Sequence, residues 1–293
     1  MMELGGLYFP EALRWHEGAL WFSDMFDSRV VRWVLGTEIE TDVDRDSGCP
    51  DMPGGLGWLP AEPDQNRDAA LLVVDCLGKR RLAVQDGRVS VHVGLGEYCP
   101  FPANDMHVDA DGTAWVGGYG FDPATDEPAG SPLLRVGPDG SVRPTAAEFV
   151  FPNGCERDGA GRLVVAETFA DRISVLEPLR TASSADKLEA KRSAVVTFLP
   201  GSGPDGRSIV PDGTIYVALA RQLVAVERRA GNPADGASSL CRVYSPARSL
   251  AVEPLDHSPV TTVRLCRVAV ALRRRLRAQT KRPLSDFRRD ASC

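Results

Sequence analysis

Short apolar runs recur along the chain, each following a turn signal and each only four or five residues long. They begin near Leu20, Leu71, Ala114, Leu163 and Ile215, at intervals of 51, 43, 49 and 52 residues. Four of the turns contain glycine, whereas the second turn has lost it and reads PDQNRD. Apolar runs of this length that are bounded by turns predict β-strands rather than helices.

A second segment, in which apolar and polar residues alternate, follows each of these runs. The five segments read RVVRWV, RRLAV, PLLRVG, RISVLE and QLVAVE. Such alternation is typical of a strand with one buried face, and the Asp-Gly pairs at Asp86 and Asp139 mark further hairpin turns. Each repeat therefore contains at least two antiparallel strands.

The repeat length decides between the all-β architectures. A repeat of about 50 residues that holds several short strands is typical of a β-propeller, in which each repeat is one blade. A β-sandwich would not repeat one hairpin signature five times, and the coils of a β-helix are far shorter. We therefore expect an all-β fold, a six-bladed β-propeller. Residues 1–227 hold five recognisable blades, and the last blade is doubtful or degraded.

Composition and charge narrow the class of partner. The chain has 293 residues and a net charge of −6, and residues 1–227 alone carry a net charge of −15. Such an acidic body argues against nucleic acid as a partner. No run approaches the roughly 18 apolar residues of a membrane span, and the N-terminal residues lack the basic and apolar regions of a secretion signal. We expect neither a nucleic acid nor a membrane partner.

The seven cysteines are an odd and scattered set without a CxxC pair. This distribution argues against a disulfide framework and against a zinc knuckle. Reduced thiols and a cytoplasmic location are the corresponding expectation. The sequence also contains no GxSxG elbow and only four histidines, so nothing in it points to a serine hydrolase.

Polar residues recur just ahead of the repeats, mostly after a proline. In a propeller the inner strand of each blade lines the central channel, so these positions would converge on one axial site. They are Glu11, Asn104, Asp105, Asn153 and Asp205. Carboxylate and amide oxygens favour Ca²⁺, Mg²⁺ or Mn²⁺ over metals that prefer thiolate. The competing interpretation is that each residue only hydrogen-bonds its own loop.

The same residues carry a resemblance to a known family. The segments are EALRW at 11–15, ND at 104–105 with VD at 108–109 and a glycine at 112, PNG at 152–154 with AET at 166–168, and PDG at 204–206. Together they resemble the SMP-30/gluconolactonase/luciferin-regenerating-enzyme family over roughly residues 6–220. The resemblance implies a six-bladed propeller with one divalent metal ion in its channel.

The resemblance also implies roles for individual residues. By position, Glu11, Asn153 and Asp205 match the metal ligands of the family. Asp205 also matches the residue proposed as general base, which makes it the candidate catalytic residue. Asn104 matches an asparagine that contacts the substrate and in some members the metal.

The function that follows from the resemblance is hydrolysis of a small lactone or ester by a metal-activated water. Such hydrolysis needs a polarised carbonyl and an activated water, and a divalent ion with open positions supplies both. Ca²⁺ is the first expectation for the ion, with Mg²⁺, Mn²⁺ or Zn²⁺ as alternatives. The alternative function is a non-enzymatic propeller that binds calcium or a small molecule. The sequence leaves the oligomeric state open.

Some positions depart from the aldonolactone hydrolases of this family. Pro102 stands where those members carry an Arg, which argues against a sugar lactone. Asp122 falls near their substrate-facing acid, and its neighbours Tyr119 and Phe121 suggest a bulkier or more apolar substrate. His107 lies three residues beyond the channel Asn and is a further candidate for substrate binding. Both Asp122 and His107 have a competing interpretation as residues with no part in a site.

The segment 228–293 departs from the family most. It carries a net charge of +9, three of the seven cysteines and no further copy of the repeat, where the family continues with a sixth blade. Three interpretations compete: a frame-shifted or non-native segment, a divergent sixth blade, and a basic amphipathic helix that binds a partner or a membrane surface. Without a sixth blade, the first and fifth blades would expose strand edges.

Overall fold

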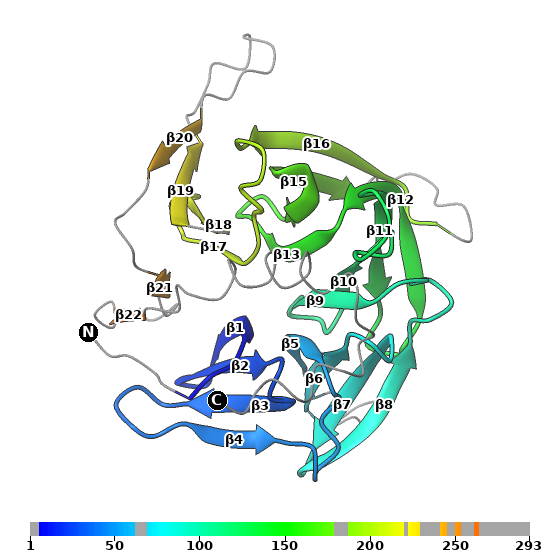
Figure 1. Ribbon diagram of the computed structural model, residues 1–293, viewed down its shortest axis with the longest axis vertical. Helices are drawn as coiled ribbons and strands as arrows, with labels where there is room; N and C mark the ends of the chain where they lie inside the picture. Colours follow the sequence, from blue (N-terminus) through cyan, green and yellow to red (C-terminus); the bar gives the residue numbers. More distant parts are fainter. Residues whose placement is uncertain are drawn as a thin grey trace.

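The chain forms β-sheets that are arranged around a central axis like the blades of a propeller (Figure 1). The computed structural model describes residues 6–61, 69–178 and 187–219, and the backbone of strands 222–228, 241–244, 250–252 and 261–263. Within these residues there are five four-stranded sheets, one two-stranded sheet and the one-turn 3-10 helix η2 (Thr168–Ala170). None of the helical structure described there is long and apolar enough to cross a membrane.

In each four-stranded sheet the strands pair antiparallel, and the strand that comes first in the sequence lies nearest the centre (Figure 1). The first sheet contains β1 (Pro10–His16), β2 (Ala19–Asp24), β3 (Arg29–Trp33) and β4 (Glu40–Val43). The second contains β5 (Pro53–Leu59), β6 (Ala70–Asp75), β7 (Arg80–Gln85) and β8 (Arg88–Gly94). The third contains β9 (Ala103–Val108), β10 (Ala114–Gly118), β11 (Gly130–Val136) and β12 (Val142–Val150). The fourth contains β13 (Pro152–Arg157), β14 (Leu163–Glu167), β15 (Arg172–Pro178) and β16 (Ala190–Thr197).

The C-terminal strands form a fifth four-stranded sheet and a separate two-stranded sheet. The fifth sheet contains β17 (Arg207–Ile209), β18 (Ile215–Leu219), β19 (Gln222–Arg228) and β20 (Cys241–Tyr244). Strands β21 (Leu250–Val252) and β22 (Thr261–Val263) form the two-stranded sheet. The predicted all-β class and propeller arrangement are confirmed, whereas the count of six blades stays a prediction. Apart from these strands, the segment 228–293 lies outside the described residues. The three interpretations of this segment therefore stay predictions.

The predicted apolar runs are the second strands of the sheets. Every residue of β6 and of β14 is buried, because each blade packs against a neighbour on both of its faces. A strand buried on both faces has a continuous apolar run instead of alternation. The inner strands were not apparent as strands in the sequence, since segments such as Pro53-Gly54-Gly55 contain residues that are depleted in strands.

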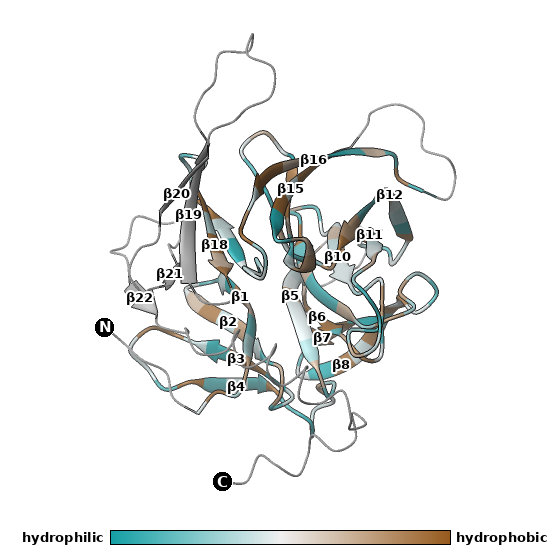
Figure 2. Ribbon diagram, turned by 45° about the horizontal axis from the view of Figure 1, so that its top comes forward, coloured by the Kyte–Doolittle hydropathy of each residue, from teal (hydrophilic) through white to brown (hydrophobic). Residues whose placement is uncertain are grey.

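Apolar clusters join each sheet to the next. Residue pairs that represent the four successive interfaces are Val30 with Val73, Leu72 with Val116, Trp115 with Val165, and Val164 with Val217. Hydrophobic residues are spread along the strands of these sheets (Figure 2). Full burial of one such side chain contributes about 1.5–3 kcal/mol. The core is therefore a series of contacts between blades, and it holds the inner strands in place around the axis.

An ion pair between a buried acid and a partly exposed arginine recurs where the second strand of a sheet meets the third. The acids Asp24, Asp75 and Glu167 end β2, β6 and β14 and are at most 3% exposed. Each pairs with the arginine five residues later, at 2.9 Å for Arg29, 2.6 Å for Arg80 and 2.7 Å for Arg172. In register, each acid lies directly opposite the first proline of an inner strand: Pro10, Pro53 and Pro152. We call these three acids the scaffold acids.

Candidate functional site

Four of the predicted site residues lie at the heads of inner strands in four different sheets. Glu11, Asn104 and Asn153 are the second residues of β1, β9 and β13, and Asp205 precedes β17 by two residues. At the heads of β1, β5, β9 and β13, two residues face one on the neighbouring strand. Such a bulge re-aims side chains and is frequent beside functional sites. The repeat thus brings four residues to equivalent positions around the axis.

The backbone is strained beside two of these positions. Ala12 has a φ of +54° and Phe151 a φ of +52°, in the left-handed region that side chains with a Cβ avoid. Each strained residue of this kind costs of the order of 1–3 kcal/mol, and the surrounding structure must supply that energy. Ala12 directly follows Glu11, and Phe151 lies two residues before Asn153. Two of the seven non-glycine residues with a positive φ in the described part of the chain therefore lie beside candidate ligands.

The second blade has no side chain at the position equivalent to the four strand-head residues. Gly54 occupies the position that corresponds to Glu11 and Asn153. A Cβ added to Gly54 would lie 2.5 Å from the carbonyl oxygen of Asn104, and one added to Gly55 would collide with Met106. Strands β5 and β9 can approach this closely only because both residues are glycines. The close approach fixes the backbone of Asn104 at the head of β9.

Asn153 is held by the loops of its own sheet and of the next. Its side chain is 5% exposed, and its Nδ2 donates to Thr168 Oγ1 at 3.2 Å. Thr168 Oγ1 in turn donates to the carbonyl of Pro204 at 2.8 Å, and the Asn153 side chain also hydrogen-bonds Asp205. Because the amide nitrogen is occupied by protein acceptors, the amide oxygen is the atom that can serve a ligand.

Three carboxylates in this region repel one another. Burial, followed by the charges of Asp205 and Asp105, raises the pKa of Glu11 well above its ordinary value. Burial and then Asp105 raise the pKa of Asp205 to about 7. Asp105 itself accepts a hydrogen bond from Arg14 Nη2 at 2.9 Å, and the same nitrogen donates to the carbonyl of Met106 at 2.6 Å. Arg14 is thus already bound by Asp105, and its charge is the smallest of the influences on the pKa of Glu11.

The donor set fits a hard divalent cation. Glu11 and Asp205 supply carboxylate oxygens and Asn153 a neutral amide oxygen, which are the ligand types of Ca²⁺ and Mg²⁺. A cation would also remove the repulsion that raises the pKa values of the two acids. In the described residues, no group of three or more His, Cys, Asp or Glu side chains is arranged to hold a metal. The candidate set has only two such residues, because its third member is an asparagine.

Three neighbours of the site were not assigned roles in the sequence prediction. Asp105 was a candidate but was not given a role, although its charge acts on both Glu11 and Asp205. Thr168 fixes Asn153, and its only sequence signal is its place in the AET segment. Burial, followed by the charges of Cys76, Asp205 and Glu11, raises the pKa of Tyr119. The hydroxyl of Tyr119 is therefore neutral and lies near the carboxylates.

His107 has a structural partner at the other end of β9 from Asn104. Its Nε2 lies 3.2 Å from Asp109 Oδ1, and the same carboxylate binds Arg157 Nε at 2.6 Å and Trp115 Nε1 at 2.9 Å. Burial alone would raise the pKa of Asp109, but hydrogen bonds from these three side chains hold it far below its usual range. The structure does not bring His107 together with Glu11 and Asp205, and its predicted role in substrate binding stays a prediction.

Asp122 lies in the loop that follows β10. Its Oδ1 accepts a hydrogen bond from the backbone N–H of Ala124 at 2.9 Å, and its own N–H donates to Asp126 Oδ2 at 2.9 Å. These contacts are those of an acid that organises its own loop. Its neighbour Phe121 is buried against Tyr119. The predicted contact of Asp122 with substrate stays a prediction.

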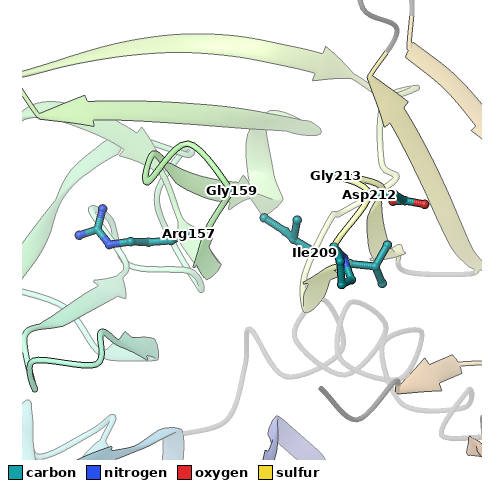
Figure 3. Close-up of a pocket in the computed structure, with 7 residues that line it drawn as sticks. Arg157, Gly159, Ile209, Asp212 and Gly213 are labelled. Atoms are coloured by element: carbon teal, nitrogen blue, oxygen red, sulfur yellow. The ribbon is translucent and has the colours of Figure 1, made fainter. Parts of the chain in front are cut away.

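A separate cavity of about 280 Å³ lies between the fourth and fifth sheets (Figure 3). The turns that line it follow β13 and β17, at the ends of these strands opposite to Asn153 and Asp205. Its lining residues are Arg157, Gly159, Ile209, Val210, Pro211, Asp212 and Gly213. None of the predicted site residues is among them, so this cavity is distinct from the candidate site.

The geometry defines a β-propeller with a cluster of oxygen donors at the heads of its inner strands. The family model described as SMP-30/Gluconolactonase/LRE-like region matches residues 9–232. The chain therefore belongs to the SMP-30/gluconolactonase/LRE-like family. No curated protein sequence matches the chain.

Solved structures with the same fold are distant in sequence. A luciferin-regenerating enzyme has a TM-score of 0.60 and 17% identity, covering 76% of this chain and 74% of its own. A gluconolactonase from Xanthomonas campestris has a TM-score of 0.58 and 20% identity, covering 84% and 78%. The calcium-binding protein regucalcin from Agrobacterium tumefaciens has a TM-score of 0.58 and 18% identity, covering 75% and 71%. At such identities the likeness shows the fold alone.

Proposed function

We propose that the chain hydrolyses a small lactone or related ester at the heads of β1, β9, β13 and β17, with one divalent cation bound there. The observation that carries this proposal is the group of acids Glu11, Asp105 and Asp205, of which only Asp105 is hydrogen-bonded to an arginine. Perturbed pKa values cluster at functional sites, where burial and like charges are combined. Membership of a family named partly after gluconolactonase supports the choice of reaction.

Glu11, Asn153 and Asp205 are the residues that would hold the cation, and Ca²⁺ is the first candidate because all three offer hard oxygens. When bound, the cation supplies Lewis-acid polarisation of the lactone carbonyl and lowers the pKa of a nearby water. Asn153 is preorganised for this role, because Thr168 and Asp205 already occupy its amide nitrogen.

Protein side chains accept and return the proton of the attacking water. Asp205, at the head of its strand beside Asn153, accepts the proton of the attacking water as the water oxygen bonds to the carbonyl carbon. When the bond from that carbon to the ring oxygen breaks, the same proton passes to the ring oxygen, and the product is a hydroxy acid. Asn104 lies at the equivalent strand position and can donate its amide N–H to the carbonyl oxygen as negative charge develops there.

The test is metal-dependent turnover. Protein treated with a chelator should lose hydrolysis of small γ- and δ-lactones in a pH-stat assay, and Ca²⁺, Mg²⁺, Mn²⁺ or Zn²⁺ should be added back one at a time. Asp205→Ala and Asn153→Ala should each abolish both cation binding and hydrolysis. Full activity after chelation would refute the proposal.

A second candidate is a propeller that binds calcium without catalysis. The fold shared with the calcium-binding protein regucalcin favours this alternative. Calorimetry separates the two functions. Cation binding that requires Asp205 and Asn153, with no turnover across the lactone panel, would support the binding protein and reject the hydrolase.

A further inference from the structure

Four aromatic rings gather beside the candidate site. Tyr119 stacks on Phe151 with ring centroids 3.9 Å apart, and Phe121 meets Tyr119 edge to face at 5.5 Å. Phe169 contacts all three, at centroid distances of 5.3 Å from Phe121, 5.5 Å from Phe151 and 6.2 Å from Tyr119. The rings come from loops of the third and fourth sheets. We call this group the aromatic cluster.

The chain ties this cluster to the candidate ligands. The backbone N–H of Tyr119 donates to the carbonyl of Pro102 at 3.0 Å, two residues before Asn104. Phe169 follows Thr168, the residue that holds Asn153. Phe151 lies two residues before Asn153 and has the strained φ described above. A large apolar ring therefore lies close in the chain to a candidate ligand.

Two rings of the aromatic cluster remain partly open to solvent. Phe121 and Phe151 are buried and form its base, whereas Tyr119 and Phe169 are only half-buried. Other apolar side chains stand exposed on loops at the same end of the strands. These are Tyr8 before β1 at 54% exposure, Leu77 after β6 at 40%, and Leu199 after β16 at 81%. Apolar side chains therefore occur on several loops at the site end of the propeller.

We propose that Tyr119, Phe151 and Phe169 form an apolar wall that selects the substrate, and that the substrate is a lactone or ester bearing an aromatic ring or an acyl chain. This inference rests on the proposed function, because it names the substrate class of the same site. Ring faces offer dispersion and stacking to an apolar substituent. They give no hydrogen bonds to the hydroxyls of a sugar lactone, so burying such hydroxyls against them is unfavourable. Tyr119 and Phe169 are the specificity residues, since they are the rings a ligand can reach.

The experiment compares two lactones that differ only in one substituent, γ-phenyl- and γ-hydroxymethyl-butyrolactone. The wild type should prefer the phenyl compound by at least about tenfold in kcat/KM, since contacts of this size in an apolar pocket are worth about 10–200-fold. Phe169→Ala should remove most of this preference by weakening turnover of the phenyl compound, while Phe169→Leu should retain part of it. The control is Trp58→Ala, because Trp58 is a half-buried aromatic residue that stacks on His16 and lies outside the aromatic cluster.

A second arm measures binding of the corresponding phenyl and hydroxymethyl pyrrolidinones, which are lactams and resist hydrolysis. The phenyl lactam should bind the wild type more tightly, and Phe169→Ala should weaken its binding while leaving Ca²⁺ or Mn²⁺ affinity unchanged. If neither lactone is hydrolysed, the proposed hydrolase function fails. Lactam binding alone then tests whether the apolar wall selects its ligand. Equal affinity for the two lactams, or hydrolysis that favours the hydroxymethyl lactone, would overturn the inference while leaving the hydrolase function intact.

Discussion

Two sets of carboxylates, at the ends of second strands and at the heads of inner strands, have opposite surroundings. The scaffold acids Asp24, Asp75 and Glu167 each bind an arginine from the next strand. Glu11 and Asp205, at the heads of the inner strands, are instead repelled by other carboxylates: Asp105 acts on both, and Asp205 acts on Glu11. Residue type and depth are therefore poor guides to the role of an acid in this fold, and the presence of a cation partner is a better one.

The electrostatics of Glu167 and Asp205 make this difference explicit. Burial alone would raise the pKa of Glu167, but hydrogen bonds from Arg172 and Ser174 outweigh burial and hold the pKa below its ordinary value. For Asp205, burial and the charge of Asp105 outweigh the hydrogen bonds from Gly206 and Asn153. An acid that is paired with a cation stabilises the fold, whereas an acid that is repelled by neighbouring carboxylates is available to bind a cationic ligand.

The largest expected effect comes from removing the charge of Glu11. Glu11→Gln should lower the affinity for the divalent cation by more than about 100-fold, because one of the two carboxylate ligands is lost. Lactone hydrolysis should fall by roughly 1,000-fold. The metal-free protein should keep its Tm or gain a few degrees, since one source of repulsion with Asp205 is gone. Calorimetry with Ca²⁺ and Mn²⁺, and thermal unfolding with and without metal, measure these changes. A large loss of metal-free stability would place Glu11 among the scaffold acids instead.

Replacing a scaffold acid by its amide should instead lower the stability of the fold and leave cation affinity unchanged. Glu167→Gln leaves two arginines, Arg172 and Arg192, without their buried carboxylate partner. Water can partly replace the lost contacts because both arginines are partly exposed, so the free energy of unfolding should fall by about 2 kcal/mol in urea titration. The intrinsic cation affinity of the folded protein should change little. If Glu167→Gln unfolds normally and instead loses cation binding, the distinction between the two sets of acids is wrong.

The fold could be predicted from the sequence because its repeat is local. The turn and the apolar strand behind it recur in each blade, and runs such as Leu71–Val74 and Leu163–Ala166 are buried on both faces. The inner strands could not be predicted in this way. Their prolines, glycines and polar residues oppose strand propensity, and neighbouring blades hold them in place. Gly54 is the clearest example, since the close approach of β9 explains it and no local rule does.

The candidate site could be predicted in part, because its four strand-head residues share one position in the repeat. Their positions follow from the register, but the interactions that distinguish them involve residues distant in sequence. Asp105 contacts Arg14 across 91 residues, and Asn153 reaches Asp205 in the next sheet. The aromatic cluster was visible only as Tyr119 and Phe121, because Phe151 and Phe169 join it through the packing of loops. The same packing assigns His107 to the Asp109 network, which its spacing from Asn104 did not indicate.

Cation binding should depend on pH with a definite sign. Because the pKa of Asp205 is raised to about 7 and that of Glu11 also lies above its ordinary value, the metal-free site keeps its protons to a higher pH than ordinary carboxyl groups would. A cation must displace these protons, so its affinity should fall from pH 8 to pH 6, by up to about tenfold per pH unit for each proton released. Calorimetry in two buffers of different ionisation enthalpy counts the protons. Binding at pH 6 with no proton release would contradict the raised pKa values.

The smallest effect belongs to an acid at the opposite end of the strands. Asp158 Oδ1 accepts hydrogen bonds from the N–H groups of Ala160 at 3.0 Å and Arg162 at 2.9 Å, and its Oδ2 binds Arg162 Nε at 2.8 Å. Asp158→Ala should therefore lower the free energy of unfolding by about 1 kcal/mol, the usual net contribution of such contacts. Asp158→Asn keeps an oxygen acceptor for the turn and should lose less. Neither variant should alter cation affinity, because this turn lies at the far end of β13 from Asn153. A change in cation binding in either variant would mean that the two ends of the propeller are coupled, and that the division between scaffold and site acids is not local.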